Sequence, residues 1–160
     1  MIVNPSFPSG SVVFCDDVRH EVTGKLTMVG VYTGQMMLTD NLPVILPQIC
    51  AVTTFRLAPP TETINPIIKI FKSGEDAPLF EMTAEVSAAQ PSDFPPLPSH
   101  PEADTVRFLQ MVITAQMQNL VVTEPCTLRV RAFVGDDEIR LGALQIIVAP
   151  QEESEAPTVQ

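Results

Sequence analysis

The sequence predicts an all-β protein, a two-sheet antiparallel β-sandwich of the immunoglobulin-like or C2-like kind with about eight strands. Two observations lead to this class. Short segments alternate apolar and polar residues with the period of two that is typical of strands. Sixteen prolines and seven glycines interrupt nearly every window long enough for a helix. At 160 residues the chain fits one domain. We expect an N-terminal extension (1–10), a single domain (11–149) and an acidic, disordered tail (150–160).

The first expected element is a hairpin. Residues 11–15 form a short apolar run, and residues 25–32 alternate so that Leu26 and Met28 share a face opposite Thr27. Polar residues separate the two runs, together with Gly24, which tolerates positive φ. We therefore predict two paired strands joined by a polar turn.

The middle of the chain supplies four further strands. Residues 35–39 are expected to rejoin a sheet, residues 40–47 to form a crossing loop, and residues 49–57 to form a strand with strict alternation. Residues 66–72 and 79–86 then form a hairpin across Ser73-Gly74-Glu75-Asp76.

A proline-rich segment, 88–104, follows and cannot hold a strand ladder, so we predict an extended surface loop. Residues 105–117 nearly satisfy a helical period, but their β-branched content and all-β surroundings favour a strand. The domain closes with a hairpin of 127–134 and 138–148 around Gly135-Asp136-Asp137, with Arg129, Arg131 and Phe133 pointing outward.

Charge and cysteine usage exclude several function classes. The formal net charge is −10, and the nine basic residues are dispersed, which disfavours nucleic acid and anionic membranes as partners. Cys15, Cys50 and Cys126 lie in or beside apolar runs without metal-ligand spacing, so we expect buried reduced thiols. The chain has no signal peptide pattern and no apolar span of membrane length, and we expect a cytoplasmic protein.

Catalytic constellations are also missing from the sequence. His20 is expected in a solvated turn and His100 in the proline-rich loop, and alternation on a strand separates Cys15 from His20. Neither a nucleophile elbow nor a phosphate-binding glycine loop occurs. We predict that the protein is not an enzyme and uses no cofactor.

The remaining hypotheses concern binding. We expect a protein-binding or accessory module, with an interaction surface made by Arg19 or by the loop residues Phe94, Pro95, Pro96 and Leu97. Exposed edge strands make a homodimer plausible. The alternative is a calcium-binding or small-ligand-binding domain that uses acidic rim loops. Its candidate ligands are Asp16, Asp17, Asp136 and Asp137.

The polar string at 16–21 has two interpretations. Its carboxylates and Arg19 form a local network that fixes the hairpin, or they form a partner-binding edge. The first is favoured because exposed ion pairs mostly serve local geometry.

The same region carries a resemblance. Phe14-Cys15-Asp16-Asp17-Val18-Arg19, followed by Gly24-Lys25-Leu26-Thr27-Met28-Val29-Gly30-Val31-Tyr32, resembles a family of small bacterial proteins of unknown function that begin with this signature. The match covers about the first quarter of the chain. It implies a bacterial, cytoplasmic, single-domain β-protein, and it brings no activity, substrate or catalytic residue.

Overall fold

The prediction of an all-β sandwich is confirmed. A computed structural model describes residues 6–95 and 107–150, which form ten strands and one short 3₁₀ helix. The three-stranded sheet has the order β1 (Ser9–Cys15), β5 (Val44–Leu57), β8 (Leu109–Val122). The five-stranded sheet has the order β4 (Gln35–Leu38), β10 (Asp137–Val148), β9 (Cys126–Val134), β6 (Ile67–Lys72), β7 (Phe80–Thr83). A separate hairpin joins β2 (Asp17–His20) to β3 (Leu26–Val29).

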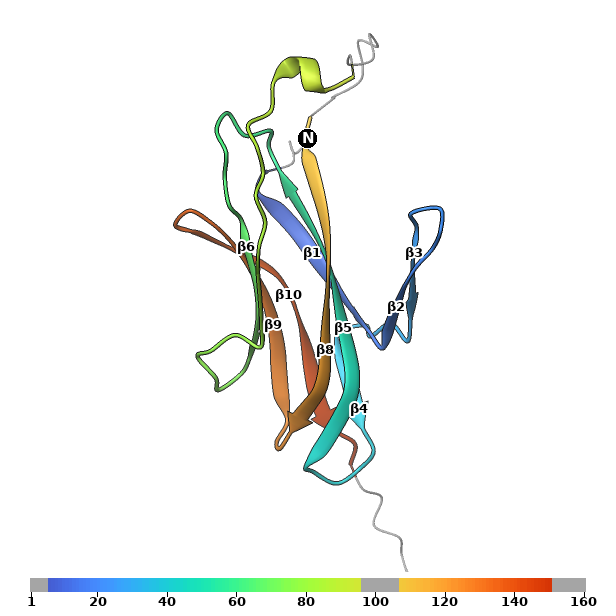
Figure 1. Ribbon diagram of the computed structural model, residues 1–160. Coiled ribbons are helices and arrows are strands. Elements are labelled where there is room, and N and C mark those ends of the chain that lie inside the picture. The colour runs from blue at the N-terminus through green and yellow to red at the C-terminus, as the bar shows by residue number, and fades with distance from the viewer. Residues whose placement is uncertain (1–5, 96–106, 151–160) are drawn as a thin grey trace, which may run out of the picture.

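Figure 1 shows an elongated molecule in which the two larger sheets face each other and the β2–β3 hairpin projects at one side. The facing sides supply one hydrophobic core. Its largest fully buried members include Phe55, Ile49, Ile68, Leu128, Leu144 and Ile146. The sheets are antiparallel except where β4 pairs parallel with β10. The immunoglobulin-like or C2-like type stays a prediction. Among the described residues, no helix is long and apolar enough to cross a membrane.

The N-terminal hairpin differs from the prediction. Strand β1 pairs with β5, from Ser9 opposite Arg56 to Cys15 opposite Cys50, and touches the second predicted strand only at the bridge between Phe14 and Tyr32. The hairpin partner of β3 is β2, which begins at Asp17 within the string predicted to be a turn. The polar residues of this segment suggest a turn, but each face of the β2–β3 hairpin lies beside solvent or beside a small apolar cluster. A strand of mostly polar residues is therefore stable here. Gly24, with φ +79°, does lie in the turn.

Strand β5 is also longer than predicted. Residues 44–47, assigned to a crossing loop, extend the strand opposite the end of β8, from Val44 opposite Val122. Pro47 is tolerated because β1 ends opposite Cys50, so β5 has only one neighbour at that point. The predicted alternation over 49–57 is confirmed, with Ile49, Ala51 and Phe55 buried in the core.

The later elements follow the predictions. Strands β6 and β7 form a hairpin around Gly74 at φ +83°, and β9 and β10 form one around Gly135 at φ +59°. The ambiguous segment is a strand, β8. In the proline-rich segment the described part contains a 3₁₀ turn, Pro91–Asp93, rather than only extended chain. The rest of that loop and the acidic tail lie outside the described residues.

Two glycines let β1 approach β10 at one corner of the sandwich. A Cβ atom on Gly10 would lie 2.4 Å from the carbonyl oxygen of Thr54 and 2.9 Å from Leu141. A Cβ atom on Gly142 would lie 2.7 Å from Val12, and the φ of Gly142 is +148°. β10 therefore packs closely against β1 at this corner.

Candidate functional site

The signature residues meet at the junction of β1, β2 and β3. Asp16 follows β1 and donates its backbone N–H to the carbonyl of Val29 at 2.9 Å, while the Tyr32 hydroxyl donates to the Asp16 carboxylate. Gly30 lies under that carboxylate with φ +66°. A Cβ atom there would be 1.9 Å from Asp16 Oδ2, so only glycine fits. The contacts of Asp16 with Val29, Gly30 and Tyr32 thus hold the β2–β3 hairpin to the sandwich.

Strand β5 anchors the same junction from the other side. The Gln48 side-chain amide donates to the Asp16 carbonyl and to Asp17 Oδ1, both at 3.1 Å. A satellite apolar cluster packs between the hairpin and the outer side of the three-stranded sheet. Its members are Cys15, Cys50, Val52, Val18 and Leu26.

Burial sets the ionisation of this junction. Desolvation, with smaller contributions from Cys50 and the neighbouring carboxylates, raises the pKa of Cys15 to about 11. Desolvation and the bond to Asp16 raise the pKa of Tyr32 to about 12. Desolvation likewise raises the pKa values of Cys50 and Cys126. All three thiols are buried and free, as predicted, and a neutral buried thiol is a poor nucleophile.

Arg19 and His20, at the end of β2, are exposed. Arg19 Nε lies 3.5 Å from Asp17 Oδ2, and their side chains are 68% and 41% exposed. His20 is exposed on β2, opposite Leu26. The predicted local ion pair is present, whereas His100 lies outside the described residues.

The four acidic candidates for calcium lie on different elements. Asp16 and Asp17 belong to the signature junction, whereas Asp136 lies in the turn between β9 and β10 and Asp137 begins β10. Throughout ranges 6–95 and 107–150, no three His, Cys, Asp or Glu side chains gather closely enough to hold a metal ion.

A hollow lies beside the proline-rich segment. Pro59, Thr61, Phe94 and Arg107 are among its lining residues, and the Arg107 guanidinium lies 5.5 Å from the centre of the Phe94 ring. Arg107 Nη2 also donates to the Pro95 carbonyl at 3.5 Å. Of the predicted interaction residues, Phe94 and Pro95 lie here, and Pro96 and Leu97 lie outside the described residues.

The outer face of the five-stranded sheet, which we call the cationic face, collects basic side chains that are far apart in the sequence. Strand register puts Lys69 opposite Arg131 and Arg131 opposite Arg140. Arg129 is two residues from Arg131, on the same side of β9. The cationic face thus holds four of the nine basic residues of a chain with net charge −10.

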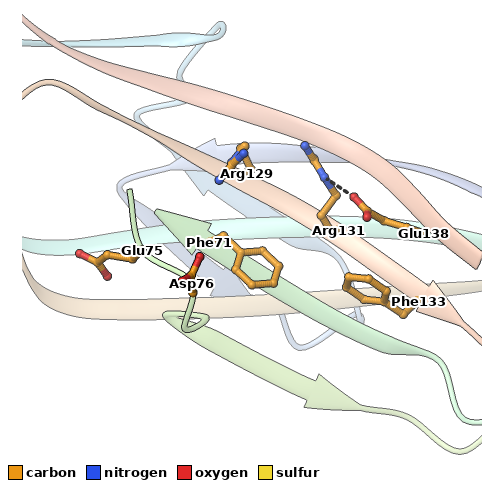
Figure 2. A pocket seen from close by; sticks show the side chains of 7 residues that line it. All are labelled: Phe71, Glu75, Asp76, Arg129, Arg131, Phe133 and Glu138. Carbon is orange, nitrogen blue, oxygen red and sulfur yellow. Dashed lines mark ion pairs between the residues drawn. The ribbon is translucent and has the colours of Figure 1, made fainter. Parts of the chain in front are cut away.

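Aromatic rings and carboxylates complete this surface, and Figure 2 shows the side chains around its hollow of about 240 Å³. Phe71 is opposite Arg129, and the Lys69 ammonium lies 5.7 Å from the centre of the Phe133 ring. Glu75, Asp76 and Glu138 also line the hollow.

Two of the four cations of the cationic face form no ion pair with another described residue. Arg131 pairs with Glu138 at 3.0 Å, and Lys69 pairs with Glu81 at 3.0 Å. Arg129 and Arg140 have no carboxylate of the described residues within salt-bridge distance. The sequence predicted the outward direction of Arg129, Arg131 and Phe133, but not that Lys69 and Arg140 join them. Only the cross-strand register reveals this arrangement, because it aligns residues that lie some 70 positions apart in the sequence, from Lys69 to Arg140.

Comparison with known proteins identifies the family without supplying an activity. No curated protein matches the sequence. A family model described as a family of unknown function, DUF6941, matches residues 10–148, which include every strand from β2 to β10 and most of β1. The chain therefore belongs to the DUF6941 family.

Proposed function

We propose that this protein is a non-enzymatic binding module whose cationic face takes an acidic segment of a protein partner. One observation carries the proposal: the face gathers Lys69, Arg129, Arg131 and Arg140 around two aromatic rings, although the chain as a whole is strongly acidic. Like charges on directly opposed strand positions destabilise a sheet. A surface that keeps three cations in one cross-strand row is therefore suited to an anionic ligand.

The side-chain chemistry favours carboxylates. The guanidinium of Arg129 has no carboxylate partner in the described residues and can hold a carboxylate through two parallel hydrogen bonds. Phe71 and Phe133 offer apolar contact beside it. Glu75, Asp76 and Glu138 line the same hollow and oppose a ligand of dense negative charge such as nucleic acid. A peptide that alternates acidic and aromatic residues fits both features.

The test uses the full chain and a capped peptide of alternating Glu and Phe. Isothermal titration should detect binding that weakens as salt is added, because exposed charges are screened. Arg129→Gln should weaken binding by roughly tenfold, since a charge-assisted hydrogen bond is worth about 1.5–3 kcal/mol.

The matched control is Arg19→Gln, which removes another exposed arginine, on the β2–β3 hairpin, and should leave binding unchanged. A capped Lys–Phe peptide of the same length should not bind. Equal loss of affinity in the two arginine variants, or no heat with the Glu–Phe peptide, would contradict the proposal.

A further inference from the structure

The edges of the two larger sheets are protected unequally. β4 and β7 have four residues each, and β7 carries Glu81. β1 has seven residues, and β10 packs closely against it at Gly10 and Gly142. β8 has 14 residues and contains no charged residue and no proline. Within the described ranges, β5 is its only partner, so one side of the longest edge strand is unpaired.

Such an edge is a template for another strand. Its unpaired N–H and C=O groups accept any extended chain, and proteins normally prevent this with lysines, prolines, bulges or short strands. β8 has one local irregularity, Asn119 at φ +53°, near its end. From Leu109 to Gln118 the register with β5 is unbroken. A regular strand of this length without charged side chains is suited to pairing with another strand.

We infer that a second copy of this chain covers the edge, with the two β8 strands antiparallel about a two-fold axis and the two three-stranded sheets joined into one. The net charge of the chain supports a second copy that binds through β8. Each copy carries −10, so two copies repel least where they meet through an uncharged strand.

The side chains of β8 are also self-complementary. In a two-fold antiparallel pair each residue lies opposite one on the same face of the sheet. The core-facing Ile113, Ala115 and Met117 would continue as an apolar face. Gln116 and Gln118 lie on the other face; the Gln116 amide donates to Gln48 Oε1, and the amide of Gln118 can donate to and accept from the second copy.

Sedimentation over a range of concentrations tests the inference, and we expect a dimer. The double variant Val112→Lys/Gln118→Lys puts like charges on both copies of the edge, and it should raise the dissociation constant by roughly tenfold or more. The control Ile45→Lys adds an exposed lysine to β5 instead of β8, on the strand that already pairs with β8 at this position. Val112 is 49% exposed and Ile45 62%, so neither change empties the core. Thermal unfolding verifies that each variant folds.

A cysteine scan then maps the pairing independently of those variants. Val112→Cys, Thr114→Cys, Gln116→Cys and Gln118→Cys are oxidised one at a time, and the native thiols are buried. A disulfide requires Cα atoms within about 7 Å, so one position near the axis should cross-link best and the yield should fall on either side.

Three results would overturn the inference. One is a monomer at every concentration in which the β8 amides that point away from β5 exchange freely with solvent. Another is a monomer in which those outward-pointing amides are protected, because residues of the same chain would then cover the edge. The third is cross-linking of Ile45→Cys as efficient as that of the β8 positions. Binding of the Glu–Phe peptide is measured separately, on the other sheet, so the two proposals fail independently.

Discussion

The β2–β3 hairpin and the cationic face assemble polar residues in opposite ways. The hairpin takes them from one continuous string, and it uses Asp16, Gly30 and Tyr32 to fasten itself to the sandwich. The cationic face takes Lys69, Arg131 and Arg140 from three strands and leaves part of their charge unpaired. The hairpin residues satisfy one another, whereas on the cationic face Arg129 and Arg140 have no ion pair among the described residues. If this contrast holds, hairpin mutations should reduce stability and cationic-face mutations should not.

Gly30→Ala should have the largest effect. The new Cβ would lie 1.9 Å from Asp16 Oδ2, and φ +66° is unfavourable for alanine. We expect a loss of about 3 kcal/mol in the free energy of unfolding, measured in urea. Gly24→Ala is the control, because Gly24 has a similar φ of +79° and open space around it. It should cost only about 1 kcal/mol, and equal losses would show that the Asp16 contact is unimportant.

Alkaline pH should have the second-largest effect, by destabilising the junction of the hairpin with the sandwich. Below pH 9 the Cys15 thiol is neutral in both states; above it the unfolded thiol ionises while the folded one, with a pKa of about 11, does not. Stability should therefore fall between pH 9 and 11, by about 2–3 kcal/mol from this group. Cys15→Ala should flatten that part of the pH profile of unfolding. An unchanged slope in the variant would contradict the assignment to Cys15.

Tyr32→Phe should have a smaller effect, because it removes the hydroxyl that donates to Asp16 and leaves the ring. We expect a loss of about 1 kcal/mol in urea unfolding. The variant should also lose the fall in stability between pH 10 and 12 that the raised Tyr32 pKa of about 12 predicts. Retention of that fall would assign it to another group.

Arg140→Gln should have the smallest effect and the opposite sign. Arg140 lies opposite Arg131, so its removal relieves a like-charge pair. We expect stability to rise by up to about 0.5 kcal/mol at low salt, and this gain to fade as salt is added. Glu138→Gln is the contrasting variant, because it breaks the pair with Arg131 and should lower stability slightly. A large loss in Arg140→Gln would make the cationic face structural, like the hairpin.

The sequence by itself determined the elements whose signal is local. The turns at Gly74 and Gly135 and the alternation of Ile49, Ala51 and Phe55 predicted strands and hairpins that the fold contains, because period and turn chemistry act over a few residues. Only the tertiary structure decided that β1 pairs with β5, that the mostly polar residues 17–20 form a strand, and that β8 has a single partner strand among the described residues. The physical reason is that pairing between distant strands depends on which faces the whole sandwich buries. No local pattern contains that information.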